Sequence, residues 1–140
     1  MVTIHYGLHA LNLKGVMSVN NTPFSCLMSC YHKDPVSLLR ESMDSICSQT
    51  LKPDELVLVE DGELTQGHYI LINEYRARLN IYSVKIPQNK GLGNALSVGL
   101  NYCKYDLVAR MDADDVCLPT RFEKQIDFMQ SNPKVDILGA

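Results

Sequence analysis

The stretch ELVLVEDG at residues 55–62 decides the fold. Its middle is an unbroken apolar run, which is typical of a strand buried on both faces, as in a parallel sheet. Its last two residues, Asp61 and Gly62, favour a turn. We therefore expect a central parallel strand that ends in a polar turn.

Strands and helices alternate on both sides of this stretch. Before it we expect a strand at 24–29 and a helix that has Asp34 as its N-cap and Pro35 at its first position, and that ends near Gln49. After it the pattern predicts helices at 65–79 and 92–103, strands at 81–86 and 106–111, a helix opened by Pro119 and a last strand begun at 135–138. The alternation predicts an α/β fold, a Rossmann-like, mostly parallel, doubly wound sheet with flanking helices and right-handed crossovers.

The spacing of apolar residues also predicts which helix faces are buried. The residues expected to point inward are Tyr69, Ile72, Tyr75 and Leu79, then Leu92, Ala95, Leu96, Gly99 and Leu100, then Phe122, Ile126 and Met129. Residues 1–22 are poorly patterned and are either a strand-forming arm or a tail. Residues 23–140 therefore make up the predicted α/β domain.

Composition excludes several classes of protein. With 46% hydrophobic and 21% charged residues the chain has the composition of a globular domain. A net charge of -3 argues against nucleic-acid binding, which usually needs a basic face. The five cysteines indicate buried, reduced thiols in a cytoplasmic protein rather than a disulfide framework. No apolar run approaches the roughly 18 residues that a membrane-spanning helix requires.

Polar side chains follow the strand ends of the predicted sheet. Ligands of such sheets bind in the crevice outside the carboxyl ends of the strands. The residues found there are Ser29 and Tyr31 after the first strand, Asp61 after the second, Asn89 and Lys90 after the third, and Asp112, Asp114 and Asp115 after the fourth. We expect these side chains to converge on one crevice.

The segment MDADD at 111–115 is the most informative of these strand ends. At a strand end Asp112 and Asp114 share a face and lie about 6–7 Å apart. One carboxylate can then reach a ribose hydroxyl while the next meets a hard cation, and Mg²⁺ or Mn²⁺ commonly bridges a carboxylate to substrate phosphates. The alternative is a solvated acidic turn that caps the following helix.

Three other features leave alternatives open. Asp61 is suited to accept a hydrogen bond from the ring N–H of a uracil-type base, but an Asp-Gly turn is the better explanation if the residue is taken alone. The segment NKGLGN at 89–94 lacks the last glycine of a dinucleotide-binding loop; its helix N-terminus favours an anion, and Lys90 adds charge. The histidines His5, His9 and His68 have no evident partners in the sequence.

Four stretches resemble one known family. They are MSCY at 28–31, QTLKPDELVLVEDG at 49–62, NKGLGNAL at 89–96 and ARMDADD at 109–115. In this order they resemble the family 2 glycosyltransferases, in particular the bacterial branch that builds capsular and exopolysaccharides. The resemblance implies a GT-A fold, a nucleotide-sugar donor with UDP favoured, Mn²⁺ or Mg²⁺ as cofactor, and inversion at the anomeric carbon.

The resemblance also implies roles for individual residues. By position it assigns Ser29, Tyr31 and Asp61 to the base, Asp112 and Asp114 to the ribose and the metal-bound diphosphate, and a share of the metal to Asp115. It places the catalytic base and the acceptor site beyond residue 140. We therefore expect this chain to carry the donor and metal half of a transferase, inactive alone, whose acceptor is a saccharide or a lipid-linked saccharide. We also expect it to lie in the cytoplasm, peripheral to the inner membrane face, and to dimerise through an exposed sheet edge.

Two other functions compete with this interpretation. A nucleotidyltransferase would also use a metal and an α/β sheet, but it needs a glycine-rich basic loop directly after the first strand, and SCYHK at 29–33 is not one. A non-catalytic nucleotide-binding or interaction domain would retain the acidic cluster without using it.

Overall fold

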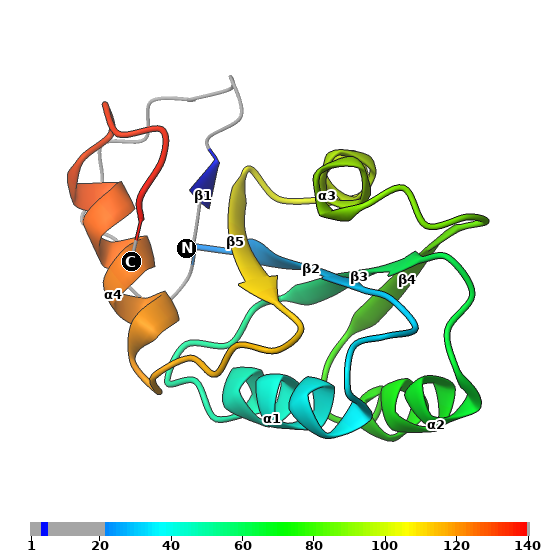
Figure 1. Ribbon diagram of the computed structural model, residues 1–140. Coiled ribbons are helices and arrows are strands. Elements are labelled where there is room, and N and C mark those ends of the chain that lie inside the picture. The colour runs from blue at the N-terminus through cyan, green and yellow to red at the C-terminus, as the bar shows by residue number, and fades with distance from the viewer. Residues whose placement is uncertain (1–3, 6–21, 140) are drawn as a thin grey trace.

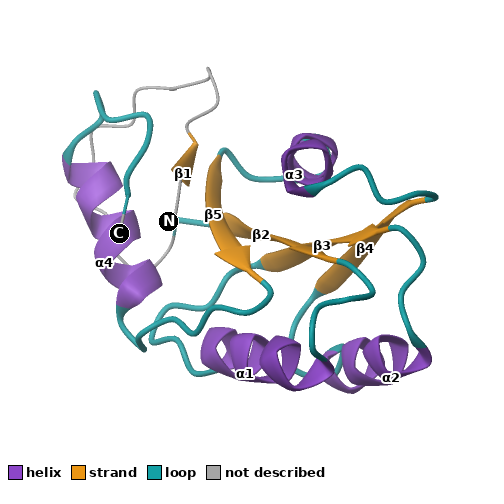
Figure 2. Ribbon diagram, viewed as in Figure 1, coloured by secondary structure: helices purple, strands orange, loops and turns teal. Residues whose placement is uncertain are grey.

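The fold is organised around one mixed sheet. The computed structural model describes residues 4–5 and 22–139. Within these residues the sheet has the strand order β1-β5-β2-β3-β4 (Figures 1 and 2). The strands are β1 (Ile4–His5), β2 (Phe24–Cys30), β3 (Glu55–Asp61), β4 (Ile81–Ile86) and β5 (Leu107–Asp112). β2 to β5 are mutually parallel and β1 runs antiparallel to β5, as expected for a mostly parallel sheet.

Helices cover both faces of the sheet. They are α1 (Val36–Cys47), α2 (Gln66–Tyr75), α3 (Leu92–Leu100) and α4 (Arg121–Ser131). Figure 1 shows α1 and α2 on one face, α3 on the other, and α4 beside the edge formed by β1 and β5. This arrangement confirms the predicted doubly wound α/β architecture.

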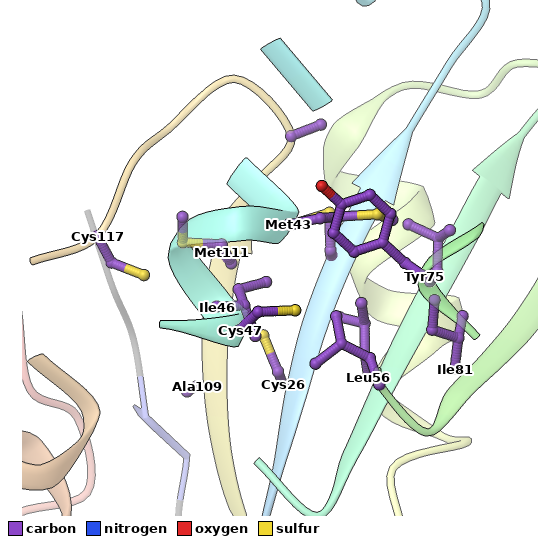
Figure 3. Packing of buried hydrophobic residues seen from close by; sticks show 14 of the residues in the cluster. Cys26, Met43, Ile46, Cys47, Leu56, Tyr75, Ile81, Ala109, Met111 and Cys117 are labelled. Carbon is purple, nitrogen blue, oxygen red and sulfur yellow. The ribbon is translucent and has the colours of Figure 1, made fainter. Parts of the chain in front are cut away.

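The central strand β3 is buried on both faces of the sheet. All its residues are buried, as the apolar run predicts. Leu56 and Leu58 belong to the core shared with α1, α2 and α4, whereas Val57 and Val59 face α3. Figure 3 shows Leu56 among Met43, Ile46 and Tyr75 in the larger cluster.

α3 approaches the sheet closely because a glycine faces it. A Cβ built on Gly99 would lie 2.5 Å from Cγ2 of Val59 and 2.6 Å from Cδ1 of Leu27. No side chain fits there unless the side chains of Val59 and Leu27 shift. The close approach packs the C-terminal part of α3 against Val59 of β3 and Leu27 of β2.

The predicted last strand at 135–138 is wrong. This segment follows α4 as irregular chain. A strand requires a neighbouring backbone to pair with, and β5 is already bonded to β2 on one side and to β1 on the other. Val135 and Leu138 instead pack as side chains against the larger core.

The start of α1 also differs from the prediction. Pro35, not Asp34, is the N-cap, and no side chain caps the helix. The Asp34 carboxylate accepts a hydrogen bond of 2.9 Å from the backbone N–H of Tyr31 instead. Asp34 is therefore turned towards the end of β2 rather than towards the helix.

Three predicted inward residues are exposed, namely Tyr69, Leu92 and Leu100. On α2 the buried position belongs to His68, which is 1% exposed. Its Nδ1 lies 2.7 Å from the Thr65 hydroxyl and its Nε2 lies 2.9 Å from the backbone oxygen of Asp34. The prediction that His68 lacks partners was therefore wrong. One partner, Thr65, lies three residues before it, and the other, the backbone oxygen of Asp34, comes from a separate loop. All three residues of α4 that were predicted to point inward are buried, which confirms the prediction for this helix.

The N-terminal segment contributes a short strand. Ile4 and His5 pair with Ala109 and Val108 of β5, which favours the strand-forming arm over the tail. The remaining leader, including His9, lies outside the described residues. All five cysteines are free, and four are buried, in agreement with the expected reduced thiols. No helix in the described part of the chain is long and apolar enough to cross a membrane.

Candidate functional site

The candidate site lies where the direction of chain winding reverses. From β2 the chain passes through α1 to β3 on one side, whereas β5 returns to pair with the other side of β2. Ser29 near the end of β2 is in register with Val59 on one side and with Asp112 on the other. Side chains at such a reversal line a crevice that helices do not fill, which is where open α/β sheets bind ligands.

A cavity of about 400 Å³ occupies this position. It is lined by Ser29, Tyr31, Asp34, Asp61, Asn89, Gly91, Leu92, Asp112, Ala113 and Asp114. Six of the residues predicted for donor binding are therefore brought together. Two predicted residues, Lys90 and Asp115, adjoin the cavity without lining it.

Asp61 is fixed by backbone groups of the loop that precedes α3. It is 2% exposed, and its two carboxylate oxygens accept hydrogen bonds of 2.9 Å from the backbone N–H groups of Lys90 and Gly91. The side-chain amide of Asn89 donates to the Asp61 backbone oxygen over 3.3 Å. These bonds attach the β4–α3 loop to the end of β3 and form one wall of the cavity.

Two glycines make this attachment possible. Gly62 has a φ of +88°, and a Cβ there would lie 3.0 Å from the backbone nitrogen of Asn89. Gly91, the N-cap of α3, has a φ of +85°. Both backbone conformations are ones that other residues rarely adopt. The glycines therefore allow the chain to bring the amides of the loop against Asp61.

The opposite wall is the acidic turn at the end of β5. Asp112 is its first residue, and the backbone N–H of Asp115 donates to the Asp112 oxygen over 3.3 Å, which closes the turn. Asp114 is exposed and lines the cavity from within the turn.

Arg110 binds the Asp112 carboxylate. Its Nη2 lies 2.6 Å and 2.9 Å from the two oxygens, and Nε adds a contact of 3.2 Å to the first oxygen. Side chains two residues apart on a strand share a face, so strand alternation was the signal that could have identified Arg110. The pair leaves Asp112 with a bound counter-charge.

Asp34 is a second residue that the sequence analysis missed as a site residue. Its carboxylate enters the cavity because the turn at Tyr31 directs it there. Burial raises the pKa of the Asp34 carboxyl above its usual value. Hydrogen bonds with Tyr31 and Cys30 oppose this shift, and the charge of Asp114 adds to it. Its position before Pro35 suggested a helix cap, which concealed this location.

The cavity is acidic and suits a cation together with an anion. Four lining residues are aspartates, and none of the ten described lining residues is basic. Among the described residues no group of three or more His, Cys, Asp or Glu side chains is arranged to hold a metal. Mg²⁺ and Mn²⁺ fit this donor set, because Mg²⁺ is commonly held by one or two carboxylates with substrate phosphates and water completing the shell. Asp112 and Asp114 are the two carboxylates of the acidic turn that line the cavity.

Comparison with known proteins identifies related sequences. Residues 25–140 match the model of glycosyl transferase family 2. The chain is 44% identical to the amylovoran biosynthesis glycosyltransferase AmsE of Erwinia amylovora, over 84% of this chain and 44% of that protein. It is 42% identical to the UDP-Gal:alpha-D-GlcNAc-diphosphoundecaprenol beta-1,3-galactosyltransferase of Escherichia coli, over 89% of this chain and 45% of that protein. The chain thus spans less than half the length of these relatives.

A solved structure has the same fold. The mannosyltransferase PcManGT from Pyrobaculum calidifontis, solved in complex with GDP-Man and Mn²⁺, superposes with a TM-score of 0.70 at 20% identity, covering 89% of this chain and 37% of that one. The likeness confirms the predicted GT-A-type arrangement of strands and helices.

Proposed function

Because the chain belongs to glycosyltransferase family 2, we propose that its cavity binds the nucleoside diphosphate of a nucleotide-sugar donor in bacterial polysaccharide biosynthesis. One observation carries the proposal: carboxylates from the separate strands β3 and β5 line a single cavity at the point where the sheet reverses its winding. Relatives at 42–44% identity are glycosyltransferases, one of amylovoran biosynthesis and one that uses UDP-Gal.

The Asp61 side of the cavity is proposed to hold the base. Each carboxylate oxygen has two lone pairs, so Asp61 can accept from a base N–H while it keeps its bonds to Lys90 and Gly91. Ser29 and Tyr31 adjoin it from the end of β2. Uracil, which offers one ring N–H between two carbonyl groups, suits this side, and we propose UDP as the nucleotide.

The acidic turn is proposed to hold the ribose and the diphosphate through a metal. Mn²⁺ or Mg²⁺, when bound, offsets the charge of the diphosphate and stabilises it as it leaves the sugar. Asp114 faces the cavity and supplies a ligand, Asp112 adds a second oxygen ligand or binds the ribose, and Asp115 supports the same ion from the end of the turn. Asn89 and Lys90 approach the donor from the N-terminus of α3, which favours an anion.

Transfer requires a further group that removes the acceptor proton. We propose that residues 23–140 form the donor-binding domain and that this base belongs to the remainder of a longer transferase, acting with inversion at the anomeric carbon. The acceptor is proposed to be a saccharide or lipid-linked saccharide, which would place the protein at the inner membrane face. The relative that acts on a diphosphoundecaprenol-linked sugar supports this choice.

Calorimetry with UDP tests the proposal directly. The 140-residue chain should bind UDP in the presence of Mn²⁺ and bind it much more weakly in the presence of EDTA, with GDP as the comparison nucleotide. Asp114→Ala should remove the metal-dependent part of the affinity. Asp106→Ala is the matched control, because Asp106 is exposed at the opposite end of the same strand. Absence of binding to any nucleotide would favour the non-catalytic domain instead.

A further inference from the structure

Three polar side chains at the end of α1 are buried, although they do not line the cavity. Ser42, Ser45 and Gln49 are spaced by three and four residues, so they lie on one side of the helix and its C-terminal extension. They are 0%, 8% and 3% exposed. We call these three residues the polar seam. Within the described part of the chain, every side-chain hydrogen bond that they make beyond α1 and its C-terminal extension is with residues 112–122.

The first contact of the polar seam is with the acidic turn. The Ser42 hydroxyl donates a hydrogen bond of 3.0 Å to the backbone oxygen of Asp112. The same oxygen accepts the Asp115 N–H that closes the turn. Ser42 therefore binds the same backbone oxygen that closes the turn carrying Asp114.

The second contact is with Cys117, downstream of the turn. The Ser45 hydroxyl accepts a bond of 3.1 Å from the Cys117 N–H. Gln49 Nε2 lies 3.3 Å from the Cys117 sulfur and donates over 2.8 Å to the backbone oxygen of Leu118. Cys117 is 6% exposed, although Leu118 beside it is 77% exposed. The polar seam thus holds Cys117 in the interior, although the side chains on both sides of it, Val116 and Leu118, are exposed.

The third contact is at the start of α4. Gln49 Oε1 accepts a hydrogen bond of 3.1 Å from the backbone N–H of Phe122. The first N–H groups of a helix have no partner within the helix, and α4 has no side-chain cap of its own. Gln49 supplies that partner from a different part of the chain, so both ends of its amide hold the same segment.

Regular structure does not hold the chain between β5 and α4. Residues 113–120 belong to neither a strand nor a helix. Buried backbone groups need hydrogen-bond partners, and in this segment the polar seam provides several of them. The course of the chain that carries Asp114 therefore depends on side chains of the polar seam, together with the Thr50 backbone N–H, which donates over 2.8 Å to the backbone oxygen of Pro119.

We propose that Ser42, Ser45 and Gln49 are positioning residues that fix the course of segment 112–122 and thereby the separation of Asp112 and Asp114. The consequence for the metal rests on the proposed function, whereas the positioning itself does not. Gln49 is the residue on which most of the contacts converge, and Ser42 is the residue closest to the two aspartates along the segment.

Thiol alkylation of the ligand-free chain tests the positioning. Cys117 lies against the seam, whereas Cys26 is fully buried in the sheet core and reports global opening. Gln49→Met keeps the length of the side chain but removes its hydrogen bonds. Under native conditions, peptide mass spectrometry should show iodoacetamide modifying Cys117 at least about tenfold faster relative to Cys26 than in the parent chain, because several bonds worth about 1 kcal/mol each are lost.

The matched control is Ser48→Ala. Ser48 also bonds at the end of α1, but its hydroxyl donates over 2.8 Å to Asp44 within the helix and does not touch segment 112–122. It should leave the ratio of the two alkylation rates unchanged. If Gln49→Met does not fold, Ser45→Ala replaces it with the same expected direction. An unchanged ratio in a folded seam variant overturns the proposal.

Metal-dependent binding tests the consequence for the site. Ser42→Ala removes one hydrogen bond at the turn, so the apparent affinity for Mn²⁺ at fixed UDP should fall about fivefold, while UDP binding in EDTA stays at the parent value. A loss that is equal with and without Mn²⁺, or no loss, contradicts the role in metal positioning. If the parent chain does not bind UDP at all, the proposed function fails, and the alkylation ratio still decides the positioning.

Discussion

The two walls of the cavity hold their carboxylates in different ways. In the Asp61 wall, formed by the end of β3 and the β4–α3 loop, the partners are the backbone N–H groups of Lys90 and Gly91. In the acidic wall, formed by the end of β5 and the turn at 112–115, the partner of Asp112 is the Arg110 side chain. An aspartate carboxylate is therefore bound by backbone N–H groups in the Asp61 wall and by a rotatable arginine side chain in the acidic wall.

This difference indicates which wall is preorganised. Asp61 cannot lose its partners unless the loop before α3 changes its course. Arg110 has rotatable side-chain bonds and is 23% exposed, so it can release Asp112 to a ligand without a change in the backbone. We infer that the Asp61 wall is set before any ligand binds, whereas the acidic wall would exchange partners on binding the proposed metal and diphosphate.

Asp61→Asn should have the largest effect. The amide keeps the shape of the side chain, but it places an N–H group against one of the two backbone N–H groups that now donate to the carboxylate. A buried donor then lacks an acceptor and a charge-assisted bond is lost, which should lower the free energy of unfolding by about 3 kcal/mol in urea titrations.

A control for this change lies at the other end of β3. Asp54 accepts one bond of 3.0 Å from the Phe24 N–H and is exposed, so Asp54→Asn keeps an acceptor for it. It should cost less than about 1 kcal/mol. Equal losses in the two variants would show that the loop is not held through Asp61.

Gly62→Ala should have the next largest effect. The new methyl group meets the backbone nitrogen of Asn89 at 3.0 Å, and the φ of +88° disfavours any L side chain. We expect a loss of about 2 kcal/mol in the free energy of unfolding. Gly93→Ala is the comparison: nothing lies within 4 Å of a Cβ there, and alanine favours the helix by roughly 0.5–1 kcal/mol. If both substitutions stabilise the chain, the close approach at Gly62 does not constrain the wall.

Asp112→Asn should cost less than either change in the Asp61 wall. The ion pair with Arg110 is partly exposed on both sides, at 23% and 25%, and partly exposed pairs contribute about 1 kcal/mol or less. Chemical denaturation of this variant beside Asp61→Asn measures the difference between the walls. A loss as large as that of Asp61→Asn would break the comparison.

Asp114→Asn should have the smallest effect on stability and a visible effect on its neighbour. Burial is the first cause of the raised pKa of Asp34 and the charge of Asp114 also contributes, so removing that charge should lower the Asp34 pKa towards its usual value. A group whose pKa is raised on folding stabilises the fold below its unfolded-state pKa and loses that contribution as pH rises through the folded-state pKa. NMR titration of the carboxyl carbons measures the shift, and an unchanged Asp34 pKa would show that the two carboxylates do not interact.

Sequence patterns predicted the elements better than their contacts. Apolar runs placed the strands β2 to β5, and caps and apolar spacing placed the helices, because those patterns are local. The Asp34 partner of His68 and the loop partners of Asp61 lie about 30 residues away along the chain, so no local pattern could show them. The expected strand at 135–138 has the correct composition, but pairing depends on which sheet edge is free.

Local patterns also predicted those residues of the site that lie at strand ends. Strand ends carry the cavity residues, so Ser29, Asp61 and Asp112 could be placed from strand boundaries and the topology of an open sheet. Asp34 was missed because its sequence neighbour Pro35 suggested a helix cap. Arg110 was missed because the prediction considered only the acidic residues of 111–115, although Arg110 shares a strand face with Asp112.

A crystal structure of the chain grown with UDP and Mn²⁺ would test the central claim most directly. We predict that the nucleotide lies across the carboxyl ends of β2, β3 and β5, with the uracil beside Asp61 and the metal bridging the diphosphate to Asp114. A nucleotide bound at another face of the sheet, or a metal held by residues other than Asp112, Asp114 and Asp115, would contradict it.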